Sequence, residues 1–198
     1  MYRAGTWLGD LAMVTLPKVA ALELTYRCNH QCIFCSCPWE SDALAREQEL
    51  GLDEWQRALH EIRRRGTRVV SFSGGEPTLR ADLLHIVDAA RDEGLQPCLI
   101  SNGRAMDEEM LRCLAKRRVN LSLSVPGIET FEQQTGYDGV EHVMRLFRAA
   151  QEMGMRVTAN IAVTKVNPSG ALRHHCLFTN QRSILHPHQP LPPWRKRT

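Results

Sequence analysis

The feature that most constrains this fold is a repeated alternation of short apolar runs with amphipathic segments. The first unit joins an apolar run at 19–25 to a segment at 52–65 whose apolar residues recur at helical spacing. The same pattern predicts further strands at 69–72, around 99–100, at 120–125 and at 156–166, and helices at 82–93, 107–118 and 140–154. Such alternation with short connections favours the α/β class, with a parallel sheet or barrel of about five strands.

Composition narrows the class of protein further. Of the 198 residues, 43% are hydrophobic and 24% are charged, which is typical of one globular domain with at most an appendage. No apolar run approaches the roughly 18 residues that a membrane span needs, and the pattern of a signal peptide is missing. We therefore expect a cytoplasmic protein without a membrane partner. A net charge of +3 is too small to indicate a nucleic-acid partner.

Three cysteines follow the first expected strand at close spacing, and they are the strongest indication of chemistry. Cys28, Cys32 and Cys35 form a C-x3-C-x2-C run. Thiolate sulfurs bind iron–sulfur clusters and zinc, and three ligands on one loop can hold three irons of a four-iron cluster while the fourth stays open. A structural zinc site needs four ligands. Spacing alone leaves zinc, a redox pair of Cys32 and Cys35, or buried cysteines as alternatives.

A second motif, Gly74-Gly75-Glu76-Pro77, closes the second expected strand. Paired glycines let a backbone approach a ligand closely. Glu76 would offer a carboxylate to an amine at the carboxyl end of a strand, where α/β barrels carry their sites. Alone, this motif is equally consistent with a tight turn. However, the motif lies one strand–loop–helix unit after the cysteine run, and the two motifs in this order are together highly specific.

The two motifs together, with the aromatic Phe34 before the last cysteine, resemble those of the radical S-adenosylmethionine (radical SAM) superfamily. The resemblance covers about residues 19–167 and implies a partial (β/α) barrel of the radical SAM type. It implies that Cys28, Cys32 and Cys35 bind a [4Fe–4S] cluster whose open iron chelates the amine and carboxylate of S-adenosylmethionine.

The resemblance also implies roles for other residues of this cofactor site. Gly74, Gly75 and Glu76 would hold the methionine amine, and the backbone near Phe34 would meet the adenine. A reduced cluster would cleave the cofactor, and a 5′-deoxyadenosyl radical would then abstract a hydrogen atom from substrate. The electron would come from a donor such as flavodoxin or ferredoxin. The cofactor would carry the chemistry and the protein would supply placement.

Four polar residues further along the chain fit the same picture less specifically. Ser101 and Asn102 end the third expected strand, where the family often has a small polar turn facing the methionine moiety. Ser122 and Ser124 alternate on the fourth strand, where family members commonly contact the ribose or carboxylate. Turn chemistry and ordinary strand polarity are the alternatives for these two pairs.

The substrate is the least determined part of the prediction. The segments at 35–50 and 122–136 look more like those of peptide-modifying maturases than those of nucleotide enzymes. We therefore predict hydrogen abstraction from a peptide. The alternatives are a cofactor-biosynthesis enzyme that acts on a small molecule, and an inactive, truncated iron–sulfur protein.

The C-terminal segment does not continue the pattern. Residues 171–198 hold five basic residues, no acidic residue, four of the eight His and four of the ten Pro. We expect a lead-in at 1–18, a core domain at 19–170 and an irregular basic tail at 171–198. Because a complete core of this family usually has six strand–helix units, the hypothesis is a shifted reading frame or a truncation near 169–171. A His-rich metal-binding or basic docking arm is the alternative for the tail.

Overall fold

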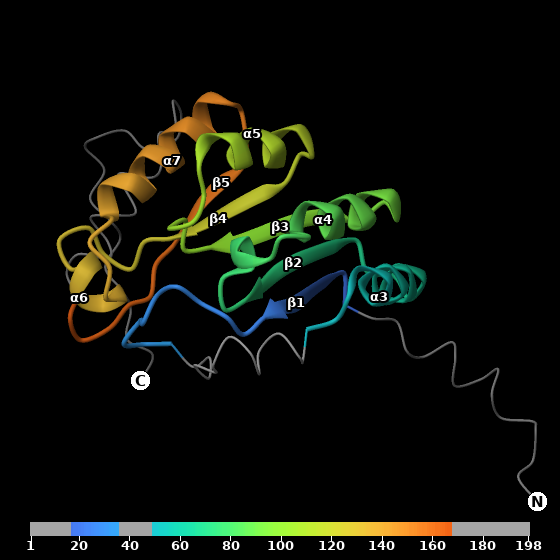
Figure 1. The fold of residues 1–198 in the computed structure, drawn as a ribbon, viewed down its shortest axis with the longest axis horizontal. Coiled ribbons are helices and arrows are strands. Elements are labelled where there is room, and N and C mark those ends of the chain that lie inside the picture. Colours follow the sequence, from blue (N-terminus) through green and yellow to red (C-terminus); the bar gives the residue numbers. More distant parts are fainter. Residues whose placement is uncertain (1–16, 36–48, 168–198) are drawn as a thin grey trace, which may run out of the picture.

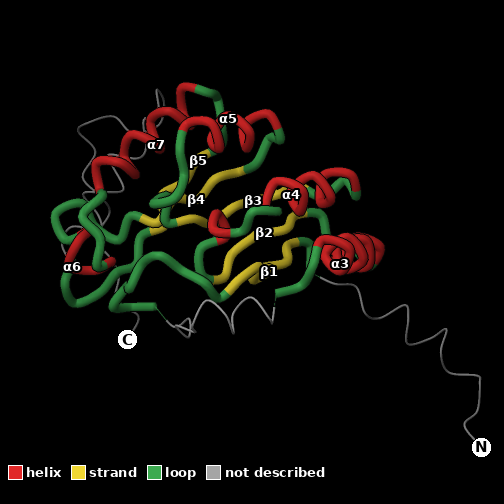
Figure 2. Tube along the Cα trace, viewed as in Figure 1, coloured by secondary structure: helices red, strands yellow, loops and turns green. Residues whose placement is uncertain are grey.

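Strands and helices alternate along the chain in the computed structural model, which describes residues 17–35 and 49–167 (Figure 2). In chain order the elements are β1 (Val19–Thr25), α3 (Leu52–Arg64), β2 (Val69–Gly74), the 3-10 helix η1 (Pro77–Leu79), α4 (Leu83–Asp92), β3 (Gln96–Ser101), α5 (Glu108–Lys116), β4 (Asn120–Ser124), α6 (Phe131–Thr135), α7 (Val140–Glu152) and β5 (Val157–Asn160). The predicted tail at 171–198 lies outside the described residues, as do residues 36–48.

The five described strands form one parallel sheet in the order β1-β2-β3-β4-β5. Each strand pairs with the next one along the chain, and within the described residues β1 and β5 are the two edges. Helices α3, α4, α5 and α7 lie on one side of the sheet (Figure 1). The architecture confirms the predicted α/β fold with about five parallel strands in a partial barrel.

The register of the sheet sorts side chains into rows of opposite character. One row is apolar and faces the helices; it consists of Leu22, Phe72, Leu99, Leu121 and Val157. The next row, of Ser71, Cys98 and Asn120, is half-buried and faces away from the helices. Because side chains alternate along a strand, this register gives the sheet an apolar face and a polar one.

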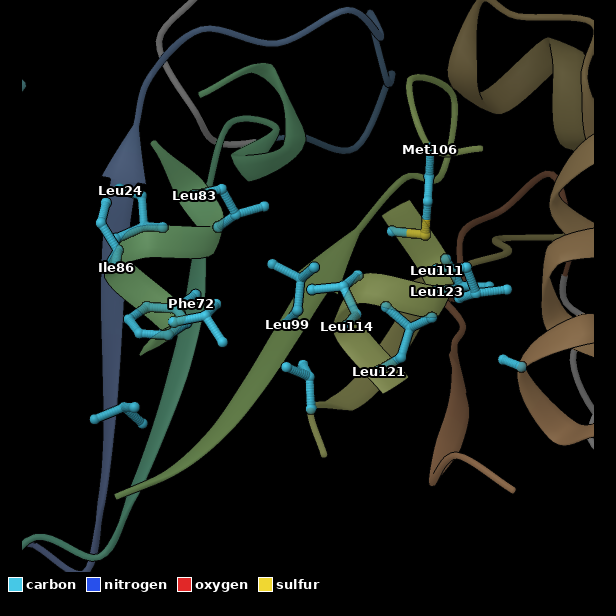
Figure 3. Packing of buried hydrophobic residues seen from close by; sticks show 14 of the residues in the cluster. Leu24, Phe72, Leu83, Ile86, Leu99, Met106, Leu111, Leu114, Leu121 and Leu123 are labelled. Carbon is cyan, nitrogen blue, oxygen red and sulfur yellow. The ribbon is translucent and has the colours of Figure 1, made fainter. Parts of the chain in front are cut away.

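The hydrophobic core fills the space between the apolar face and the helices (Figure 3). Phe72, Leu99 and Leu121 from the strands are essentially inaccessible, as are Ile86 of α4 and Leu114 of α5. Burying each such side chain contributes about 1.5–3 kcal/mol. The core thus holds the strands in place, and the carboxyl ends of the strands carry the loops that matter for function.

Local sequence rules account for the helix boundaries. The Asp107 carboxylate accepts a hydrogen bond from the backbone N–H of Met110 at 2.8 Å, which caps the start of α5. Glu54 reaches back to the backbone N–H of Gly51 at 2.8 Å at the start of α3. Gly94, just past α4, has a φ of +71°, in the left-handed region that glycine adopts without strain.

Two local predictions need correction. The strand expected over 156–166 is only four residues long: it ends at Asn160, and the chain turns at 165–166, where Asn167 Oδ1 accepts the backbone N–H of Thr164 at 2.7 Å. Helix α6 was not expected, since five residues are too few to show a helical repeat. None of the helices in the described part of the chain is long and apolar enough to cross a membrane.

Candidate functional site

A pocket of about 140 Å³ lies where the carboxyl ends of the strands meet the cysteine loop, residues 26–35. It brings together residues from five parts of the sequence. Its lining consists of Cys28, His30, Cys32, Phe34, Cys35, Ser73, Gly74, Gly75, Ile100, Ser101, Asn102, Ser124, Pro126 and Thr135.

Nine of the eleven predicted site residues line this pocket, and two do not. Glu76 is wholly buried behind it. Ser122 lies two residues before Ser124 on β4 and lines a larger, neighbouring cavity of about 670 Å³ on the polar face of the sheet. Ile100 lines both cavities, so the two adjoin each other.

The cysteine loop is attached to the short helix α6 through its backbone. The N–H of Gln31 donates to the carbonyl of Thr135 at 3.1 Å, and the N–H of Ile33 donates to the carbonyl of Gln134 at 2.9 Å. The last carbonyls of a helix have no partner within the helix, so they are available to such donors. Helix α6 therefore helps to hold the cysteine loop in position, and no pattern in the sequence indicates this role.

The three thiols surround the pocket instead of meeting at one point. Within residues 17–35 and 49–167, no three His, Cys, Asp or Glu side chains lie close enough to hold a single metal ion. Burial raises the pKa of the Cys28 thiol, and it raises the pKa of Cys32 to about 11. Three soft sulfur donors spread around one pocket fit a cluster in which each thiolate takes a different iron.

His30 lies inside the cysteine loop and packs among aromatic rings. Its side chain is buried, with ring centroids 6.2 Å from Phe131 and 5.2 Å from Tyr137. Burial and the charge of Arg104 lower the pKa of His30 to about 4, so the imidazole is neutral at pH 7. Among the described residues its Nε2 has no hydrogen-bond partner. These contacts hold the imidazole against Phe131 and Tyr137 in the wall of the pocket.

The paired glycines allow two backbone segments to touch. A Cβ on Gly75 would overlap the carbonyl oxygen of Arg27, and Gly74 has a φ of +112°. The N–H of Gly75 donates to the carbonyl of Thr25 at 2.7 Å, and the N–H of Glu76 donates to that of Arg27 at 2.7 Å. Glycine is thus required here for contact with the start of the cysteine loop, in addition to any contact with a ligand.

The carboxylate of Glu76 is occupied by donors of the chain itself. Oε1 accepts from the Thr78 backbone N–H at 3.0 Å, from its hydroxyl at 2.5 Å and from the Ser101 hydroxyl at 2.8 Å. Oε2 accepts from the backbone N–H of Asn102 at 2.7 Å. Burial raises the pKa of Glu76, although these hydrogen bonds oppose the shift. The carboxylate therefore joins the ends of β2 and β3, and its predicted contact with the methionine amine stays a prediction.

An ion-pair network lies next to the start of the cysteine loop. It was not predicted from the sequence. Arg27 Nε lies 2.8 Å from Glu49 Oε1, and Arg80 Nη1 lies 3.4 Å from Glu49 Oε2. Arg80 also pairs with Asp82 at 2.7 Å and donates to the carbonyl of Leu24 at 2.9 Å. The network links the end of β1, Glu49 just before α3, and the turn after η1.

Comparisons with known proteins agree with this geometry. A family model described as the Radical SAM superfamily matches residues 22–174. The PqqA peptide cyclase of Rhodopseudomonas palustris is 36% identical over 156 residues, which are 77% of this chain and 41% of the cyclase. The Fe-coproporphyrin III synthase of Methanosarcina barkeri is 32% identical over 154 residues, 75% of this chain and 38% of the synthase. The chain thus spans about two fifths of the length of these curated relatives.

The fold is also similar to that of a solved structure. Streptococcus suis SuiB, in a crystal structure bound to S-adenosylmethionine, aligns with a TM-score of 0.72 at 19% identity, over 85% of this chain and 38% of SuiB. The crystal structure of SuiB bound to precursor peptide SuiA gives the same TM-score of 0.72. At this level of identity the similarity concerns the fold, and it agrees with the partial barrel of parallel strands.

Proposed function

The chain belongs to the radical SAM superfamily, and from this membership we propose that it holds a [4Fe–4S] cluster and S-adenosylmethionine in the pocket above its sheet. One observation carries the proposal: three thiols and the Gly74–Gly75 backbone, which come from two separate motifs, line a single pocket. In α/β barrels, sites lie at the carboxyl ends of the strands, and this pocket does too.

Each lining residue would have a defined task. Cys28, Cys32 and Cys35 would each bind one iron, and the Gly74–Gly75 backbone would offer polar groups to the methionine amine. Phe34, 39% exposed beside the thiols, would lie against the adenine. Bound together, the cluster and S-adenosylmethionine supply a 5′-deoxyadenosyl radical for hydrogen abstraction, with an electron from a flavodoxin- or ferredoxin-like donor.

We propose a peptide as the substrate class. Two relatives support this choice by name, a PqqA peptide cyclase and SuiB bound to precursor peptide SuiA. The cavity of about 670 Å³ adjoins the pocket that the three thiols line, and its own lining includes the polar side chains of Ser71, Ser122 and Thr158. The relative named Fe-coproporphyrin III synthase supports a second candidate, a small-molecule substrate in the same cavity.

The test is anaerobic reconstitution of this chain with iron and sulfide, followed by electron paramagnetic resonance of the reduced protein. We expect a reduced-cluster spectrum that changes when S-adenosylmethionine is added, and formation of 5′-deoxyadenosine with reductant. Alanine in place of Cys28, Cys32 or Cys35 should abolish the stoichiometric cluster, whereas Cys98→Ala, on β3, should retain it. If the spectrum of the cluster does not change when S-adenosylmethionine is added, the chain is a passive iron–sulfur protein and the proposal is overturned.

A further inference from the structure

We propose that Asn102 is a positioning residue that donates a hydrogen bond to the sulfur of Cys28 and raises the reduction potential of the cluster. The inference rests on the proposed function, because it takes Cys28 as a cluster ligand. The polar turn after β3 would then contact the cysteine loop, in place of the expected contact with the methionine moiety.

The backbone of Asn102 is held rigidly. Its N–H donates to Oε2 of the buried Glu76 at 2.7 Å, and the preceding Ser101 donates its hydroxyl to Oε1 of the same carboxylate at 2.8 Å. Asn102 itself is 8% exposed. A buried carboxylate that accepts two bonds from one turn fixes the position of that turn relative to β2.

The side-chain amide has only one orientation that satisfies its neighbours. Oδ1 accepts the backbone N–H of Arg104 at 2.9 Å, so this atom must be the oxygen. The amino group then faces the cysteine loop. Nδ2 lies 2.8 Å from Oδ1 of Asn29 and 3.7 Å from Sγ of Cys28. The amide therefore presents a donor to the Cys28 sulfur in the orientation that its contacts with Arg104 and Asn29 require.

A second contact holds the two segments together. Arg104 donates through Nη1 to the backbone carbonyl of Asn29, and its guanidinium lies 4.3 Å from the centre of the Tyr137 ring. The turn after β3 thus forms hydrogen bonds with both the backbone and the side chain of Asn29. Because Cys28 and Asn29 are adjacent, these contacts fix the direction from which the Cys28 sulfur enters the pocket.

Elementary electrostatics gives the sign of the effect. Reduction adds an electron to the cluster and increases the negative charge on its sulfur ligands. An N–H donor stabilises the more negative state, so hydrogen bonds to the sulfurs raise the reduction potential. Glu76 would share in this effect indirectly, by holding Asn102 in place.

The experiment compares two amide-to-leucine variants, because the chain offers a matched control. Asn120 on β4 donates through Nδ2 to the sulfur of Cys98 at 3.6 Å, a contact of the same kind at a cysteine outside the motif. Each variant is reconstituted with iron and sulfide, and the midpoint potential is measured by a redox titration followed by electron paramagnetic resonance. We expect Asn102→Leu to shift the potential to a lower value and Asn120→Leu to leave it unchanged.

The outcomes separate this inference from the proposed function. If the wild-type chain binds no cluster, the proposed function fails, and this inference fails with it. If the wild type and Asn102→Leu carry equal clusters with equal potentials, only this inference is overturned. Should Asn102→Leu not fold, Asn102→Ala removes the amide without adding a charge. A folded Asn102→Ala protein whose cluster has a lower potential supports the inference, whereas an unchanged potential, or the loss of the cluster, overturns a role in setting the potential.

Discussion

At the scale of single residues, the buried carboxylate of Glu76 joins the ends of β2 and β3 through hydrogen bonds. Replacing it with alanine removes the acceptor for two buried backbone N–H groups, those of Thr78 and Asn102. Each buried donor left without a partner costs about 1–3 kcal/mol. We expect Glu76→Ala to lower the free energy of unfolding by at least about 2 kcal/mol, measured by urea denaturation. Glu109→Ala, at an exposed position of α5, should change it by less than about 0.5 kcal/mol. Equal losses in the two variants would contradict this role.

Glu49 makes stability depend on pH in the acid range. Burial alone would raise the pKa of Glu49, but hydrogen bonds from Arg27 and Thr25 outweigh it and hold the pKa below its usual value. The contribution of Glu49 is therefore present above the pKa of the unfolded chain, about 4.3, and is lost as pH falls through the lower folded value.

A comparison of wild type with Glu49→Gln measures this contribution. The difference in unfolding free energy should be about 1–3 kcal/mol at pH 7 and should shrink below about pH 4.3. Chemical denaturation at intervals between pH 7 and pH 3 is the measurement. A difference that stays constant down to pH 3 would show that the charge of Glu49 contributes nothing.

The residues that could be predicted are those whose role can be recognised from their neighbours in the sequence. The spacing of Cys28, Cys32 and Cys35 and the Gly74–Gly75 pair have a local chemical meaning, and the structure gathers them around one pocket. Glu49 and Arg80 are 31 positions apart and meet only because the end of β1 lies beside the turn after η1. No single-sequence pattern encodes such a meeting.

At the scale of elements, the junction between β1 and β2 should be intolerant of any side chain at Gly75. A methyl group there would overlap the Arg27 carbonyl, which belongs to backbone and cannot rotate away. We expect Gly75→Ala to lower the free energy of unfolding by about 1–3 kcal/mol, as overpacking does. Gly51→Ala is the control, since its Cβ would lie 3.7 Å from the nearest atom and its φ of −74° suits any residue. The midpoints of thermal unfolding of the two variants test this, and similar midpoints would show that the junction can adjust.

Elements with a long repeat were predictable and short ones were not. The apolar stripe of α3 gave its position to within a residue, and the strand at 19–25 matches β1. Helix α6 and the turn at 161–167 depend on tertiary contacts, such as the hydroxyl of Thr164 donating to Oε1 of Gln134 at 2.9 Å. Short elements like these are stabilised by what surrounds them, so their own sequence says little.

At the scale of the whole molecule, the five cysteines in the described part of the chain should fall into two groups once a cluster is bound. Cys28, Cys32 and Cys35 line the pocket, whereas Cys98 and Cys113 are half-buried elsewhere on β3 and α5. We expect reconstitution to protect the first group from iodoacetamide and to leave the labelling of the second group unchanged. Peptide mass spectrometry before and after reconstitution makes the comparison. Continued labelling of Cys28 at full iron content would contradict its assignment as a ligand.

The alternating rows of the sheet have a consequence for engineering this chain. Side chains in the row of Phe72, Leu99 and Leu121 decide whether the protein folds, and those in the row of Ser71, Cys98 and Asn120 face the larger cavity. A combinatorial library restricted to the second row would therefore vary the lining of the larger cavity, which we propose to take the substrate, while it leaves the first row untouched. Any shift of one residue in strand register would exchange the two rows and lose both properties at once.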